Sequence, residues 1–184
     1  MLNALARMYE RAQGALPWTV IAGHFAKHGI SSVNPTLNRI EGIDGDGSAY
    51  AVTEDQLAQQ LGRNERVGLT WWLTPAVQFP CVYTFSRGHR IHAYVLDSVI
   101  DEADRSRLQR ALVELFGLAV GSGSGRGLMI DWSDRAGNQD WDAIFIDKAP
   151  MGVVPDVLRI EPDLLTTAAS WPVGEVNALL VTRV

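Results

Sequence analysis

Residues 67–97 constrain the fold more than any other part of the chain, because they predict three consecutive antiparallel strands. Apolar and polar side chains alternate over residues 67–74, and a period of two is typical of a half-buried strand. An apolar segment follows at 79–85, and a tight connection at 86–89 leads into a third strand over 90–96. This meander predicts an α+β protein built around an antiparallel sheet.

The composition permits an ordinary globular domain. The chain has 184 residues, 47% hydrophobic and 20% charged, so one domain spanning 1–184 can bury a substantial core without disulfides or metals. The net charge is −5 and no basic run is present, which argues against a nucleic-acid partner because phosphate recognition needs clustered Lys and Arg. The single cysteine, Cys81, excludes an intramolecular disulfide.

No part of the sequence has the pattern of a signal peptide or a membrane span. Charged side chains interrupt the apolar residues near the N-terminus, and no window reaches the length of a membrane-crossing helix. We therefore expect a cytoplasmic protein with no membrane partner.

Helical spacing of apolar side chains predicts four helices. Residues 2–13 and 18–28 each have one apolar face and stop at a glycine. A capping-box pattern begins a short helix at Thr53, which should end at Gly62. The strongest signal covers 101–116, where acidic residues in the first turn suit the helix macrodipole.

Further strands are predicted outside the meander. They cover residues 36–43 and 49–52 around a turn, residues 127–132 and 142–148 as a hairpin, and the last apolar run at 177–184. The expected fold is a single α+β domain, with a mostly antiparallel sheet of five or more strands and helices packed on one face.

Two motif-like segments lack the spacing that their chemistry requires. The glycine-rich run 121–127 follows a predicted helix and precedes a strand, the reverse of a phosphate-binding loop, so it predicts a flexible connection. The run 44–48 begins like a calcium loop, but Ala49 and Asp55 occupy positions that need glycine and glutamate. A hairpin turn explains it.

The spacing of two histidines gives weak evidence for a metal-binding site. His24 and His28 are four residues apart on a predicted helix, which allows both imidazoles to bind one ion. A functional zinc site needs a third ligand, and the glutamate of an H-E-x-x-H motif is absent. His89 and His92 lie near the predicted hairpin without a defined partner. We therefore predict no metal and no cofactor.

An acidic segment flanked by tryptophans is the candidate binding surface. Five aspartates lie between residues 130 and 147, and one arginine, Arg135, offsets them before Lys148. Crowded carboxylates repel one another unless a cation, a basic neighbour or solvent relieves them. The candidate contact residues are Asp131, Trp132, Asp134, Asp140, Trp141 and Asp142.

Three interpretations of this segment remain open. It is a solvated acidic loop with two core tryptophans, a surface on which tryptophans anchor and acids steer a basic protein partner, or a divalent-metal site for hydrolysis. We favour the second for the whole protein, which gives a non-enzymatic inhibitor of a toxin or enzyme. Bacterial immunity proteins are of this general kind, an analogy of size and charge that no motif carries.

Two other classes of function compete with the inhibitor hypothesis. One is a small-molecule-binding protein or hydrolase-type enzyme, with a pocket between the sheet and the N-terminal helices that uses His24, His28, His92 or Tyr94 with a carboxylate. The other is a homo-oligomer subunit with a symmetric apolar interface. No catalytic residue is predicted from sequence.

Overall fold

The computed structural model describes residues 4–136, 138–161 and 164. Its helices are α1 (Trp18–Lys27), α2 (Glu54–Gly62), α3 (Glu102–Gly121) and α4 (Trp141–Phe145). Its strands are β1 (Leu5–Arg11), β2 (Val33–Asn34), β3 (Arg39–Ile43), β4 (Ala49–Val52), β5 (Val67–Thr74), β6 (Val77–Ser86), β7 (His89–Val95), β8 (Gly125–Asp131) and β9 (Val157–Ile160).

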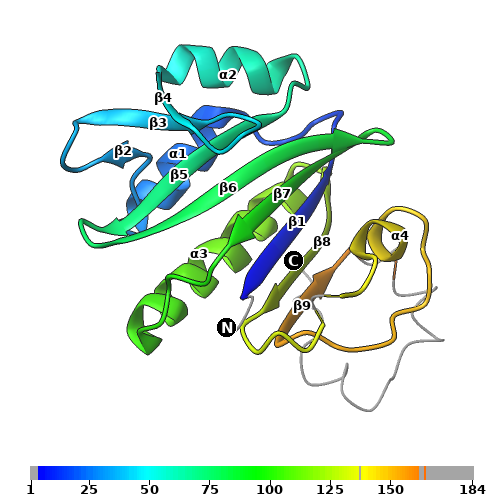
Figure 1. The fold of residues 1–184 in the computed structure, drawn as a ribbon. Coiled ribbons are helices and arrows are strands. Elements are labelled where there is room, and N and C mark those ends of the chain that lie inside the picture. Colours follow the sequence, from blue (N-terminus) through cyan, green and yellow to red (C-terminus); the bar gives the residue numbers. More distant parts are fainter. Residues whose placement is uncertain (1–3, 137, 162–163, 165–184) are drawn as a thin grey trace.

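One antiparallel sheet organises the described part of the chain (Figure 1). Its strand order is β2-β3-β5-β6-β7-β1-β8-β9, and β4 pairs with β3 outside this path. The predicted α+β class and the meander of β5, β6 and β7 are confirmed. The sheet therefore brings the start of the chain, in β1, between strands that lie about 80 to 120 residues later.

The prediction of a helix over residues 2–13 is wrong. Leu5–Arg11 forms β1, which pairs along its length with β7 on one side and β8 on the other. Met8 and Tyr9 face opposite sides of the sheet and are both fully buried. A strand buried on both faces lacks a clean period of two, and here its apolar residues also matched helical spacing.

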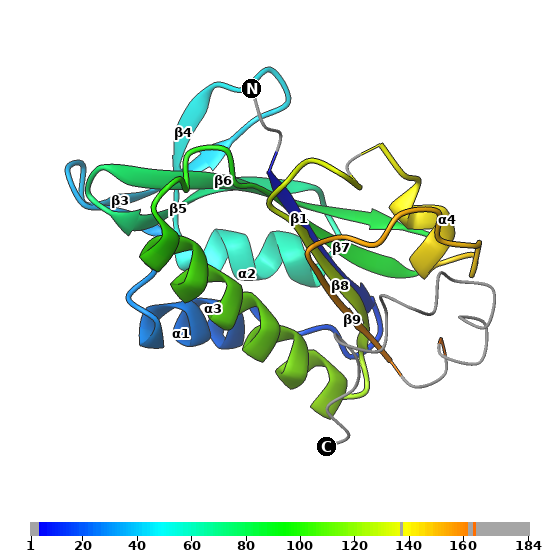
Figure 2. The same ribbon diagram turned by 90° about the horizontal axis from the view of Figure 1, so that it is seen from below.

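Helices α1, α2 and α3 cover one face of the sheet, and α4 lies on the other (Figure 2). In the larger core, the Trp71 ring centroid lies 5.4 Å from that of Trp18 and 4.5 Å from that of Phe25. A smaller core lies beneath α4, where Tyr9 packs against Phe145 with a centroid separation of 4.8 Å. Helices on one face were expected, and α4 is the exception.

Local start signals place two helices where they were expected. Thr53 and Gln56 form the predicted capping box of α2, which ends at Gly62. The Asp101 carboxylate caps α3 by accepting two backbone amides. The helix α3 continues past its predicted end at Gly117, because a glycine in an open position weakens a helix without ending it.

The predicted strand over 142–148 is also wrong. Trp141, Ile144 and Phe145 are buried at helical spacing, and the Asp140 carboxylate caps α4 by accepting the Ala143 amide at 2.9 Å. The predicted strand 177–184 lies outside the described residues. Within the described ranges, none of the helices combines the length and apolarity needed to cross a membrane.

Two glycines of the glycine-rich run are required by packing. The run joins α3 to β8 as predicted, since α3 ends at Gly121 and β8 begins at Gly125. A Cβ atom at Gly125 would lie 2.8 Å from the amide nitrogen of Val120 in α3, and one at Gly127 would overlap the Phe145 ring of α4. Glycine therefore allows a helix to approach β8 closely from each face.

Candidate functional site

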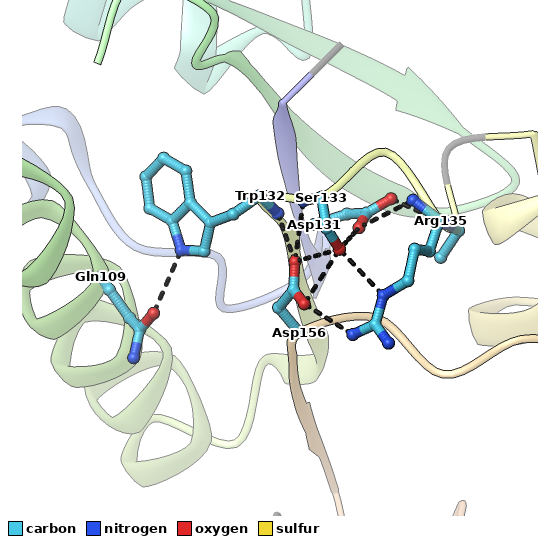
Figure 3. Close-up of polar contacts among 7 residues, drawn as sticks. Gln109, Asp131, Trp132, Ser133, Arg135 and Asp156 are labelled. Atoms are coloured by element: carbon cyan, nitrogen blue, oxygen red, sulfur yellow. Dashed lines mark hydrogen bonds and ion pairs between the residues drawn. The ribbon is translucent and has the colours of Figure 1, made fainter. Parts of the chain in front are cut away.

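Asp131 of the predicted acidic surface is enclosed at the end of β8 (Figure 3). Its carboxylate accepts the backbone amide of Ala136 at 2.7 Å and that of Arg135 at 3.3 Å, and the Ser133 hydroxyl lies at 3.5 Å. All of these donors are within five residues of it in sequence. Asp131 therefore holds its own loop closed, and the expectation of an exposed contact residue is wrong here.

Asp156, which the sequence analysis missed, completes this loop (Figure 3). Its carboxylate accepts the amides of Trp132 at 2.7 Å and Ser133 at 2.9 Å, and it forms an ion pair with Arg135 at 2.7 Å. Partial burial alone raises the pKa of Asp156, but Ser133, Arg135 and the two amides outweigh it and lower the pKa below its ordinary value. No local signal connects Asp156 to residues more than 20 positions earlier.

The two tryptophans of the segment are not free anchors. Trp141 is 1% exposed and stacks on Phe145, so its predicted place on a contact surface is wrong. Trp132 is partly buried, and its indole nitrogen donates to the Gln109 carboxamide at 3.1 Å (Figure 3). Arg105 lies over the Trp132 ring at 5.4 Å from the centroid. One indole is therefore enclosed and the other is held against α3.

The remaining acids of the segment keep partial exposure. Asp134 is half-buried at a positive φ of 55°, Asp140 caps α4, and Asp142 accepts the Tyr9 hydroxyl at 2.7 Å. Arg7 lies 3.5 Å from the Asp142 carboxylate. Arginines from distant strands thus offset part of the negative charge, a compensation that the sequence alone did not show.

A second polar cluster lies on the helix-covered face of the sheet and centres on Glu10. The side chain is fully buried, and one carboxylate oxygen accepts the Leu16 amide at 2.9 Å and the Ser124 hydroxyl at 3.1 Å. The other oxygen lies 2.7 Å from Nε2 of His92 and 3.7 Å from the guanidinium of Arg90. Strand pairing produces this cluster, because Glu10 of β1 sits directly opposite Arg90 of β7.

The hydrogen bonds of the cluster assign its protonation states. Burial alone raises the pKa of Glu10, but His92, the Leu16 amide and Arg90 outweigh it and keep the pKa below its ordinary value. Burial lowers the pKa of His92, although Glu10 acts in the opposite direction. The lowered pKa of His92 favours the neutral imidazole, which in this geometry donates from Nε2 to Glu10 and accepts at Nδ1 from the Tyr94 hydroxyl at 3.2 Å.

A cavity of about 300 Å³ lies beside this cluster, between the sheet and the first two helices. Arg90 and Trp18 line it and are only 4% and 2% exposed. The Arg90 Nη1 donates to the Leu16 carbonyl at 2.5 Å, but the Arg90 Nε and the Trp18 Nε1 have no hydrogen-bond partner among the described residues. Two residues that line one cavity thus each carry an enclosed N–H donor without an acceptor among the described residues.

The other walls of the cavity are mostly apolar. They come from the turn before α1, the end of α2 and the start of α1, and they comprise Ala12, Ala15, Pro17, Thr19, Ala58, Leu61, Gly62 and Asn64. A wider groove of about 570 Å³ runs beside α1, but its lining among the described residues is neutral apart from Glu54. The smaller cavity therefore combines several small apolar side chains with the buried guanidinium-bearing Arg90.

The structure places the histidines of the sequence analysis in separate regions. His92 and Tyr94, which the pocket alternative named, belong to the Glu10 cluster, and neither lines the cavity beside it. His24 and His28 lie on α1 against α3, and His89 contacts the Arg87 carbonyl on the surface. Cys81 is fully buried, and burial raises the pKa of its thiol, so it behaves as a small hydrophobe.

Comparison of the chain with protein-family models, with curated proteins and with solved structures found no match. Function is therefore inferred from the geometry of the site.

Proposed function

We propose that the protein binds a small organic carboxylate in the cavity between β7, α1 and α2. The observation that carries this proposal is the pair of unpartnered N–H groups on Arg90 and Trp18, two nearly fully buried residues that line one cavity. Leaving a buried donor unpaired costs about 1–3 kcal/mol. Neither donor is accessible in the structure, so a ligand with acceptor oxygens would satisfy them by displacing the side chains that enclose them.

The lining supports a carboxylate with an apolar body. A guanidinium pairs with a carboxylate more strongly than with a neutral acceptor, and Arg90 is the charged residue of this lining. The side chains of Ala15, Pro17 and Leu61 offer apolar surface opposite it. At about 300 Å³ the cavity lies at the small end of ligand sites, which suits a monocarboxylate of modest size.

The charge balance of the cluster supports proton-linked binding. Glu10 and Arg90 nearly cancel, and His92 is neutral. A bound carboxylate adds one negative charge near these groups, which favours protonation of His92. Binding should therefore tighten as the pH falls from 7.5 to about 6.

The experiment compares a panel of aliphatic and aromatic monocarboxylates with their primary amides, using calorimetry and tryptophan fluorescence. Trp18→Phe keeps the aromatic ring and removes the indole N–H, and we expect it to weaken carboxylate binding by about tenfold. Trp141→Phe, on the opposite face of the sheet, is the matched control and should bind like the wild type. Absence of binding across the panel, or equal affinity in both variants, would overturn the proposal.

Recognition of a basic protein partner stays a prediction, as do the single domain of residues 1–184 and the cytoplasmic location. Of the six residues named for that contact, Trp132, Asp134, Asp140 and Asp142 keep some exposure. These four residues define the part of the loop on which an inhibitor or immunity-type contact would depend.

A further inference from the structure

We propose that His24, His28 and Glu114 form a binding site for a divalent transition metal such as Zn²⁺. One nitrogen from each histidine and one oxygen of Glu114 all lie within 4.8 Å of one another. This site is separate from the proposed carboxylate cavity, whose lining does not include these three residues.

Two helices bring the three side chains together. His24 lies in the last turn of α1 and His28 is the residue that caps its C-terminal end, and their ring centroids are 4.9 Å apart. Glu114 comes from α3 and reaches His28 with 3.0 Å between its Oε2 and the imidazole Nε2. The structure thus supplies from a distant helix the third ligand that the H-x-x-x-H spacing lacked.

His24 keeps one ring nitrogen free for a metal ion. It is 7% exposed, and its Nε2 lies 2.8 Å from the Ala111 carbonyl oxygen, so Nε2 carries the proton and Nδ1 keeps a lone pair. Histidine ligands commonly donate their other N–H to a carbonyl in this way. Burial lowers the pKa of His24, which favours the neutral imidazole that binds metal.

The spacing and exposure suit a four-coordinate ion with one open position. Two ligands of a tetrahedral Zn²⁺ lie about 3.3 Å apart when each bond is about 2.0–2.1 Å. The His28–Glu114 separation of 3.0 Å is close to this value, and the Glu114 side chain, 53% exposed, is free to adjust its position toward an ion. Its exposure leaves room for a water molecule as the fourth ligand.

The test titrates the EDTA-treated full chain with Zn²⁺ alone by calorimetry, and with Co²⁺ alone by visible absorption. We expect one Zn²⁺ per chain, a rise in the thermal midpoint with added Zn²⁺, and a Co²⁺ spectrum of a four- or five-coordinate site. These measurements use no carboxylate, so their outcome is independent of the proposed function.

Three variants make the assignment specific. His28→Ala and Glu114→Gln should each weaken Zn²⁺ binding by at least about tenfold. Glu102→Gln removes the same charge from an exposed position on α3 and should leave the affinity unchanged. His24 is left intact because it is buried. Absence of saturable binding, or equal loss in all three variants, would show that His28 and Glu114 form only an interhelical ion pair.

Discussion

Two buried carboxylates near opposite ends of β1 have different environments. Glu10 lies in β1, and Asp131 sits opposite Leu5 at the end of β8. The partners of Asp131 are amides and a hydroxyl within five residues of it. The partners of Glu10 include His92 and Ser124, more than 80 residues away.

The difference suggests different roles: Asp131 stabilises a loop, whereas Glu10 belongs to a network that could respond to a ligand. Amides of neighbouring residues satisfy the Asp131 carboxylate and hold its loop closed. Glu10 instead holds a neutral imidazole and a buried guanidinium next to a cavity with unpartnered donors. A network assembled from distant strands is where charge and protonation can respond to a ligand.

The largest expected effect follows from removing the Glu10 carboxylate. Glu10→Ala leaves the Arg90 charge buried without its partner and leaves the Leu16 amide without an acceptor. We expect a loss of about 3–5 kcal/mol in the free energy of unfolding, measured by urea denaturation. A loss below about 1 kcal/mol would contradict the central role given to this carboxylate.

Removing the Asp131 carboxylate should cost less. Asp131→Ala leaves the buried Ala136 amide unpaired, and we expect a loss of about 1–3 kcal/mol in the free energy of unfolding. Asp131→Asn keeps an acceptor oxygen and should recover part of this loss. The comparison of the two carboxylates fails if Asp131→Ala destabilises the protein as much as Glu10→Ala does.

The pH dependence of stability tests the neutral state of His92. Its pKa in the folded state is below that of the unfolded chain, so below about pH 6.5 the unfolded state binds more protons. The free energy of unfolding should therefore fall between pH 7 and pH 5, by at most about 1.4 kcal/mol per pH unit from this group. His92→Gln should show a shallower decrease in the same urea experiments, and an unchanged slope would argue for a protonated His92 in the fold.

The smallest effect on stability is expected at half-buried Asp134 and exposed Asp140, when each is replaced by the similarly shaped asparagine. Asp134→Asn with Asp140→Asn removes two charges, while asparagine tolerates the positive φ at 134 and caps a helix well. The free energy of unfolding should change by less than about 0.5 kcal/mol. If a basic protein contacts this loop, immobilised wild-type protein should retain it from a lysate and the double variant should not. An identical retained set would place any such contact elsewhere.

Local signals predicted the parts of the fold that depend on neighbouring residues. The meander over 67–97 and the caps at Thr53 and Asp101 needed only alternation, turn residues and capping chemistry. The strand β1 could not be recognised this way, because its two-sided burial depends on β7 and β8. Its assignment as a helix also hid the pairing of Glu10 with Arg90.

The residues of the candidate sites also divide into those that the sequence pointed to and those that only the tertiary structure revealed. The sequence offered His24, His28, His92 and Tyr94 for the alternative pocket, and it gave His24 with His28 only weak evidence for a metal-binding site, from which no metal was predicted. Arg90, Trp18 and Glu114 gained their roles only from tertiary placement. The sequence did not show that part of the loop's negative charge is offset from another strand, as it is at Asp142 by Arg7.

The glycines of β8 have a consequence for engineering the chain. Residues 121–127 have the composition of a linker, a type of segment usually chosen for fusing a reporter or changing a length. Here Gly125 lies against α3 on one face of the sheet, and Gly127 lies against Phe145 of α4 on the other. Both glycines therefore sit where a helix approaches β8 too closely for a larger side chain. A single methyl group at position 127 would wedge α4 away from the sheet, so this apparently permissive stretch should be among the least tolerant to substitution.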